Sequence, residues 1–160
     1  MHVTRTNKVA ISEFIIGGLF LVCGCAIYLL FRTKTLNIYR WTSLIGFSDY
    51  VDYMRQQVLY WNIPSFVKYC LPDGLYCAAY ILMIDAIWSN DKGIMKKIIM
   101  SFVPIVTIIS EVLQYFGLIK GTFDIYDLTC YTIPPVAYVS AKYANIMFNY
   151  KRIKEWKSIF

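Results

Sequence analysis

The sequence has few of the residues that most enzymes and metal centres use. Its single histidine, His2, is the second residue, so neither a histidine-based catalytic centre nor a histidine metal site is predicted. No serine lies in a nucleophile elbow, no glycine-rich phosphate loop occurs, and the five cysteines include no CxxC pair. Charged residues amount to only 16%. The usual hydrolase, nucleotide-binding and zinc-ribbon patterns are therefore excluded.

What is abundant is apolar. Hydrophobic residues make up 58% of the 160 residues and the mean hydropathy is +0.50, above the roughly 45–50% apolar content of soluble domains. Aromatic residues reach 18%, including fourteen tyrosines, which suits a lipid–water boundary. The net charge is +6, and most of the basic residues fall between apolar segments without forming an arginine-rich run. They therefore indicate how the chain is oriented in a membrane and a contact with anionic head groups, rather than a nucleic-acid partner.

Four apolar segments predict an all-α, polytopic integral membrane protein with one transmembrane domain over residues 1–160. The expected spans are residues 14–31, 71–88, 98–119 and 128–148. The first carries no charge and is followed by no small-x-small cleavage site, so a retained helix is favoured over a signal peptide. The last contains Pro134 and Pro135, which predict a kink and freed backbone carbonyls that neighbouring groups must satisfy.

The long connection between the first two spans has helical periodicity. From Phe47 to Trp61 apolar residues recur at helical spacing, while Asp49, Asp52 and Gln56 take the other side. This pattern predicts an amphipathic helix over residues 47–61, lying in the membrane interface and ended by Pro64.

Lysine and arginine counts predict the orientation. Nine of these residues lie in the N-terminal segment, the second connection and the tail, and Lys142 adds to that side. Six lie in the first and third connections. The balance places both termini in the cytoplasm.

Polar residues in and beside the spans define a candidate site. The start of the second span, the end of the third and the start of the fourth share one side of an antiparallel bundle, which the charge count makes the outer side. We therefore expect a set of polar residues to converge there on an outward-facing acidic pocket: Asp73, Glu111, Gln114, Asp124, Asp127 and Tyr131.

Several uses of this pocket compete. Glu111 at the middle of a span costs roughly 2.5–3.5 kcal/mol, so it has a role. Protonated, it would act as structural glue by hydrogen-bonding across helices. Ionised with its neighbours, the group would bind a ligand or a divalent cation such as Mg²⁺ or Ca²⁺, although no cofactor is required. Two carboxylates with split pKa values would provide acid–base catalysis.

Four further features carry expectations. Asp85 is expected to pair with Lys92, Lys96 or Lys142 near the inner surface, towards which Lys142 snorkels. Gly17–Gly18 resemble a packing notch for another helix. Cys70 and Cys130 fall at one membrane level, and pairing between them is left open.

The pattern "SExxQ" at residues 110–114 followed by "GTFDxxDL" at residues 121–128 resembles the VanZ-like family of small bacterial membrane proteins. The resemblance covers residues 71–144, and its specific residues are Glu111, Gln114, Asp124, Asp127 and Leu128. The family usually has an arginine between the glutamine and the aspartates, where this chain has Lys120 and Gly121. The family is named for a small protein associated with teicoplanin resistance, and the resemblance implies a place in the bacterial inner membrane.

The leading functional hypothesis is a VanZ-like protein whose acidic pocket engages a polar or cationic group of an envelope lipid, glycolipid or lipophilic glycopeptide. One alternative is an oligomeric membrane effector or pore, for example in antiphage defence, which would assemble as a homo-oligomer or with a protein partner. Another is a cation-dependent enzyme acting on lipid-linked substrates.

Overall fold

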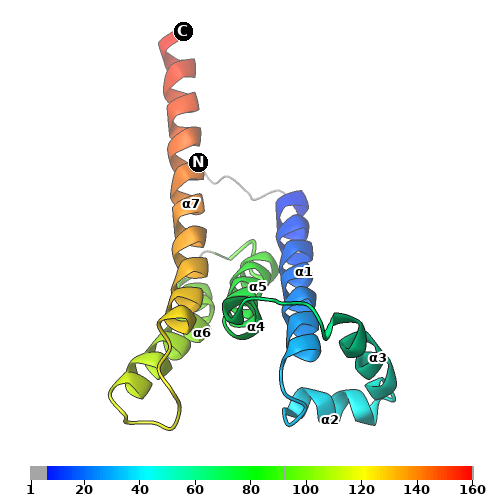
Figure 1. Cartoon of the computed structure of the whole chain (residues 1–160). Helices are drawn as coiled ribbons and strands as arrows, with labels where there is room; N and C mark the ends of the chain where they lie inside the picture. The colour runs from blue at the N-terminus through cyan, green and yellow to red at the C-terminus, as the bar shows by residue number, and fades with distance from the viewer. Residues whose placement is uncertain (1–6, 92, 160) are drawn as a thin grey trace.

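A computed structural model describes residues 7–91 and 93–159. Within these ranges the chain is helical and has no strand. Seven helices follow one another (Figure 1): α1 (Asn7–Phe31), α2 (Asn37–Leu44), α3 (Ser48–Val58), α4 (Ser65–Tyr69), α5 (Leu71–Ile87), α6 (Ile94–Tyr115) and α7 (Ile125–Ile159). The all-α prediction is confirmed. Two of the helices, α1 and α6, are long and apolar enough to cross a membrane.

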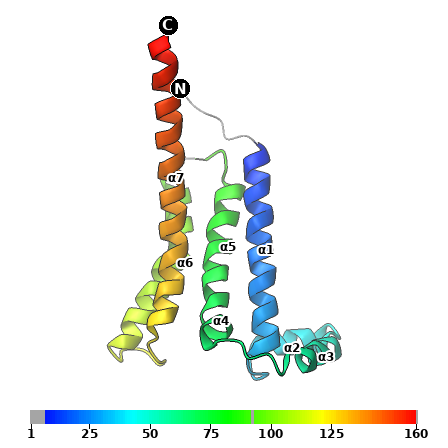
Figure 2. The same cartoon turned by 45° about the horizontal axis from the view of Figure 1, so that its top comes forward.

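The helix α5 is the centre of the bundle. It contacts α1 on one side and both α6 and α7 on the other, as Figure 2 shows. Consecutive long helices, α1, α5, α6 and α7, run in alternating directions. The start of α1, the end of α5, the start of α6 and the end of α7 therefore lie at one end of the bundle, and the short helices α2 to α4 lie at the other (Figure 2).

Small residues allow α1 to approach α5 closely. Gly17 and Gly24, seven residues apart on α1, are buried. A Cβ on Gly17 would lie 2.8 Å from Met83 Cγ, and one on Gly24 would lie 3.0 Å from Tyr76 Cε1. Gly18 has nothing within 4 Å. The predicted notch is therefore present at Gly17, and its second member is Gly24 rather than Gly18.

The helices of the α6–α7 hairpin have ends that differ from those of the predicted spans. The third span is expected at residues 98–119, and the helix found there, α6, is Ile94–Tyr115. Gly117 ends it in a left-handed conformation with φ +67°, and two hydrogen bonds, Leu118 N–H to Leu113 O and Gly117 N–H to Gln114 O, form a Schellman motif. The fourth span is expected at residues 128–148, and these residues lie within the longer helix α7, which begins at Ile125 and continues to Ile159.

The first connection also differs from its prediction. The helix expected over residues 47–61 is shorter, Ser48–Val58, and a further helix, α2, precedes it. Gly46, with φ +73°, separates them. Together α2 and α3 lie beside the C-terminal end of α1, on one side of it (Figure 2).

Arg55 and Tyr39 attach these two helices to α1. Arg55 Nη1 donates to Leu29 O at 2.7 Å and to Arg32 O at 2.9 Å, and it also contacts the Tyr39 hydroxyl. That hydroxyl donates in turn to carbonyls at the same helix end, with Arg32 O at 3.1 Å. Burial raises the pKa of Tyr39, although Arg55 opposes the shift, so the hydroxyl remains a donor. The carbonyls that α1 leaves unpaired at its C-terminus are thus satisfied by a cation and a phenol.

The prolines of α7 do not interrupt the helix, and α5 covers the carbonyls that they free. Pro134 and Pro135 cannot donate to the carbonyls of Cys130 and Tyr131, four residues earlier. The Cys77 thiol donates to Tyr131 O at 3.7 Å. At Gly74 the α5 backbone comes so close that a Cβ would lie 3.2 Å from Cys130 O.

Candidate functional site

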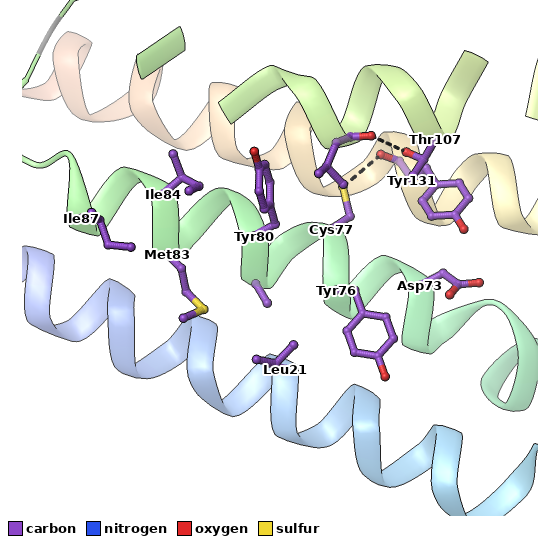
Figure 3. Close-up of a pocket in the computed structure, with 12 residues that line it drawn as sticks. Leu21, Asp73, Tyr76, Cys77, Tyr80, Met83, Ile84, Ile87, Thr107 and Tyr131 are labelled. Carbon is purple, nitrogen blue, oxygen red and sulfur yellow. Dashed lines mark hydrogen bonds between the residues drawn. The ribbon is translucent and has the colours of Figure 1, made fainter. Parts of the chain in front are cut away.

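A groove runs along α5 between α1 and the α6–α7 pair (Figure 3). Its volume is about 560 Å³. Most of its lining is apolar or aromatic, and two polar side chains, Asp73 and Tyr131, lie towards one end in Figure 3. The other lining residues are Leu21, Tyr76, Cys77, Ala79, Tyr80, Met83, Ile84, Ile87, Val103 and Thr107.

Arg32 fixes the polar end of the groove. Its Nη2 donates to Tyr69 O at 2.9 Å and lies 3.9 Å from Asp73 Oδ2. The guanidinium lies over two rings, 5.0 Å from the centre of Tyr28 and 4.9 Å from that of Tyr69. Arg32 thus places one positive charge beside Asp73, and the Tyr131 hydroxyl is a hydrogen-bond neighbour of the same carboxyl group.

A thiol and two carboxylates meet just beyond this end. Ligand atoms of Cys70, Asp124 and Asp127 all lie within 4.8 Å of one another. Cys70 is the residue before α5 and is only 2% exposed. Burial, reinforced by Asp127 and Asp124, raises the pKa of the Cys70 thiol to about 12. Asp124 precedes the first residue of α7, where its Oδ1 accepts the N–H of Tyr126 at 2.8 Å and caps the helix.

Glu111 reaches this group from α6. It is 6% exposed, and its carboxylate faces the backbone N–H of Asp124. Within the described ranges, Glu111 Oε2 and Asp127 Oδ1 are buried atoms without a hydrogen-bond partner. A buried polar atom left unpaired costs about 1–3 kcal/mol, and more when it is charged. A hydrogen-bond donor or a cation bound beside these two oxygens would remove this cost.

Five of the six predicted site residues lie near this end of the bundle: Asp73, Glu111, Asp124, Asp127 and Tyr131. The sixth, Gln114, packs on the turn. A Cβ on Gly121 would lie 2.6 Å from Gln114 Cδ, so that glycine makes room for the glutamine. Among the described residues no hydrogen bond joins the Gln114 side chain to the carboxylates.

Two members of the site were not predicted from the sequence. Cys70 was considered only as a small buried residue or as a partner of Cys130, and both are free, buried thiols. Arg32 was counted only for orientation. The signal for Cys70 was its place immediately before "LPDG", which puts it at the level of Asp73. No local sequence pattern indicates the contact between Arg32 and Asp73, because the whole first connection separates these two residues in the chain.

A second ionic group lies at the opposite end of α5. Asp85, 2% exposed, pairs with Lys96 at 2.6 Å and with Lys142 at 2.8 Å. Lys142 lies 3.8 Å from Glu13, and Lys96 also donates to Trp88 O at 2.7 Å. The predicted pairing of Asp85 with Lys96 and Lys142 is confirmed, and Lys92 lies outside the described residues. Two acids and two bases of four helices thus balance one another, which indicates a structural role.

Comparisons of the chain with family models, with curated proteins and with solved structures gave no match.

Proposed function

We propose that the protein is a four-span membrane protein that binds an amphiphile of the cell envelope. The hydrocarbon part would lie in the groove along α5, and a cationic or hydroxyl-rich head group would meet Asp73 and the acidic residues beside it. The observation that carries this proposal is the apolar groove of about 560 Å³ that has Asp73 and Tyr131 towards one end.

Four spans are part of the proposal. In addition to α1 and α6, α5 has 17 residues, about 26 Å at 1.5 Å per residue, which approaches the roughly 30 Å of a bilayer core. Its one buried charge near the inner end, Asp85, is neutralised by two lysines. The α7 residues Ile133, Val136 and Val139 are exposed and apolar, as lipid contact requires.

The interfacial position of α2 and α3 supports the same arrangement. Both helices lie beside the C-terminal end of α1, and they carry exposed aromatic residues that favour the head-group level, among them Trp41, Tyr50 and Tyr53. With the termini in the cytoplasm, this end and the acidic residues would face outward in a bacterial inner membrane. The VanZ-like resemblance belongs to the proposal and depends on Glu111, Gln114, Asp124, Asp127 and Leu128.

The oligomeric pore is a weaker alternative. A pore needs polar side chains on an outer helix face, where copies meet around water. Here Asp85 and Glu111 are buried. The exposed charged residues of α1 and α6, Lys8 and Lys97, lie in the first turns of these helices, and many large apolar residues are exposed along the rest.

Photo-crosslinking tests the groove. The purified protein in lipid nanodiscs would be exposed to a phosphatidylethanolamine with a photoactivatable group in its acyl chain and, separately, to a lipophilic glycopeptide. Leu21→Trp fills the groove from α1, and we expect it to reduce labelling of groove residues several-fold. Val22→Trp is the matched control, because Val22 is adjacent, 65% exposed and outside the groove.

Asp73→Asn tests the polar end. We expect it to weaken capture of whichever probe binds through a cation, while Asp49→Asn on the exposed interfacial helix leaves capture unchanged. Equal labelling of wild type, Leu21→Trp and Val22→Trp with both probes would show that the groove holds no amphiphile.

A further inference from the structure

We propose that Cys70, Asp124 and Asp127 form a binding site for a thiophilic divalent cation of the Zn²⁺ class. The inference goes beyond the proposed function, and it depends on neither the groove nor the orientation in the membrane. Its basis is the meeting of one sulfur and two carboxylate ligands within 4.8 Å, supported by the unpartnered oxygens of Glu111 and Asp127.

The three ligand atoms lie close enough together to reach a tetrahedral site by a small shift. Zinc–oxygen bonds of about 2.0–2.2 Å and zinc–sulfur bonds of about 2.3 Å imply ligand atoms about 3.3–3.7 Å apart. The three ligand atoms here lie within 4.8 Å of one another, so they would move together by about 1 Å. Side-chain rotation provides such a shift, and Asp124 can contribute its second oxygen while Oδ1 continues to cap α7.

Charge favours a cation at this place. Four carboxylates lie near one another, those of Asp73, Glu111, Asp124 and Asp127. Among the described residues, Arg32 is the one cation within ion-pair distance of any of them, and it lies against Asp73. Glu111, 6% exposed, presents Oε2 without a partner beside Asp124. A divalent ion would neutralise the excess charge, and Glu111 would serve as a fourth ligand or would orient a bound water.

The ligand set selects the class of metal. Mg²⁺ and Ca²⁺ prefer six to eight oxygen ligands, whereas a thiolate with two carboxylates suits Zn²⁺ or Co²⁺. On binding, the metal–sulfur bond forms as the thiol proton is released to solvent, so the step needs no oxidant or reductant. Cys70 and Asp127 lie at the N-terminal ends of α5 and α7, and these ends favour anionic ligands.

Cobalt substitution tests the site in the full chain in detergent. After treatment with a chelator and its removal, the wild type should bind one equivalent of Co²⁺ and show a sulfur-to-cobalt charge-transfer band in the near-ultraviolet. Cys70→Ser should abolish the band and weaken Co²⁺ and Zn²⁺ binding by more than about 100-fold, because even an outer partner of a metal site is worth 10- to 100-fold. Cys130→Ser is the matched control, because that buried thiol lies nearby but outside the group, and it should leave both measurements unchanged.

A second variant keeps the test independent of folding. Asp124→Asn preserves the helix cap, since asparagine caps as well as aspartate, but it removes an anionic ligand, so metal affinity should fall while helix content stays constant. The proposal is overturned if the wild type binds no Co²⁺ or Zn²⁺, if the band persists in Cys70→Ser, or if Mg²⁺ or Ca²⁺ displaces Co²⁺ equally well. None of these results bears on lipid capture, so the two proposals fail separately.

Discussion

Removal of the Asp85 charge is expected to destabilise the protein far more than removal of an equally short ion pair at the surface. Asp85→Asn preserves the side-chain volume but leaves the ammonium groups of Lys96 and Lys142 facing each other, at positions where they now lie 2.6 Å and 2.8 Å from the carboxylate oxygens. The Asp85 side chain is 3% exposed and that of Lys96 is 12% exposed, so water cannot replace the lost charge.

The magnitude follows from the burial of each partner. Breaking a buried ion pair by removal of one member costs about 3–5 kcal/mol. Lys142 is 39% exposed and can turn outward from the bundle, so the cost comes mainly from Lys96. We therefore expect the lower end of the range, about 3 kcal/mol, in the free energy of unfolding.

Asp52→Asn is the matched control. Asp52 also lies 2.6 Å from its lysine, Lys34, but the two side chains are 44% and 58% exposed, and exposed pairs contribute less than about 1 kcal/mol. Unfolding by SDS in mixed micelles, followed by circular dichroism, would measure both variants. Adding Lys96→Met to Asp85→Asn should recover at least about 1 kcal/mol, because it removes the stranded ammonium. Equal losses for Asp85→Asn and Asp52→Asn would refute the reasoning from burial.

Two further predictions use the same unfolding assay or proteolysis. Gly17→Leu should cost about 1–3 kcal/mol, because even a Cβ at Gly17 would lie 2.8 Å from Met83 Cγ, whereas Gly18→Leu should stay within about 0.5 kcal/mol; similar losses for the two would contradict the packing of α1 on α5. Arg55→Met should cost about 1.5–3 kcal/mol, since it removes charged hydrogen bonds to the end of α1, and should make α3 more sensitive to chymotrypsin, while the exposed Arg40→Met should do neither.

The long helices were predictable because lipid and core both require apolar runs, and such runs are visible in the sequence. Their ends were less predictable. The apolar residues continue past Tyr115, but Gly117 ends α6 through a left-handed turn. Gly46 does the same for α2, whose short and polar sequence has no span-like signal. In both cases a single glycine, rather than a change in hydropathy, sets the boundary.

The part of the site that could be predicted is the part that follows from the antiparallel order of neighbouring helices. Spacing and antiparallel neighbours place Asp73, Glu111 and Asp127 at one level of the bundle. The contact of Arg32 with Asp73 requires the first connection to bring α4 back to the end of α1, and no local pattern encodes that path. For Cys70 the sequence left open a pairing with Cys130, and its carboxylate neighbours, Asp124 and Asp127, are more than fifty residues away in the chain.

Pro134 and Pro135 have a consequence for the axial alignment of α5 and α7. The carbonyls that they free, on Cys130 and Tyr131, meet Gly74 and the Cys77 thiol of α5. A slide of one helix past the other by a single turn would separate the Cys77 thiol from Tyr131 O and would set a bulkier residue where Gly74 admits the α7 backbone. The prolines therefore help to set the axial register of α7 against α5. They select one alignment between two otherwise smooth apolar helices, and that alignment brings the start of α5 level with the start of α7.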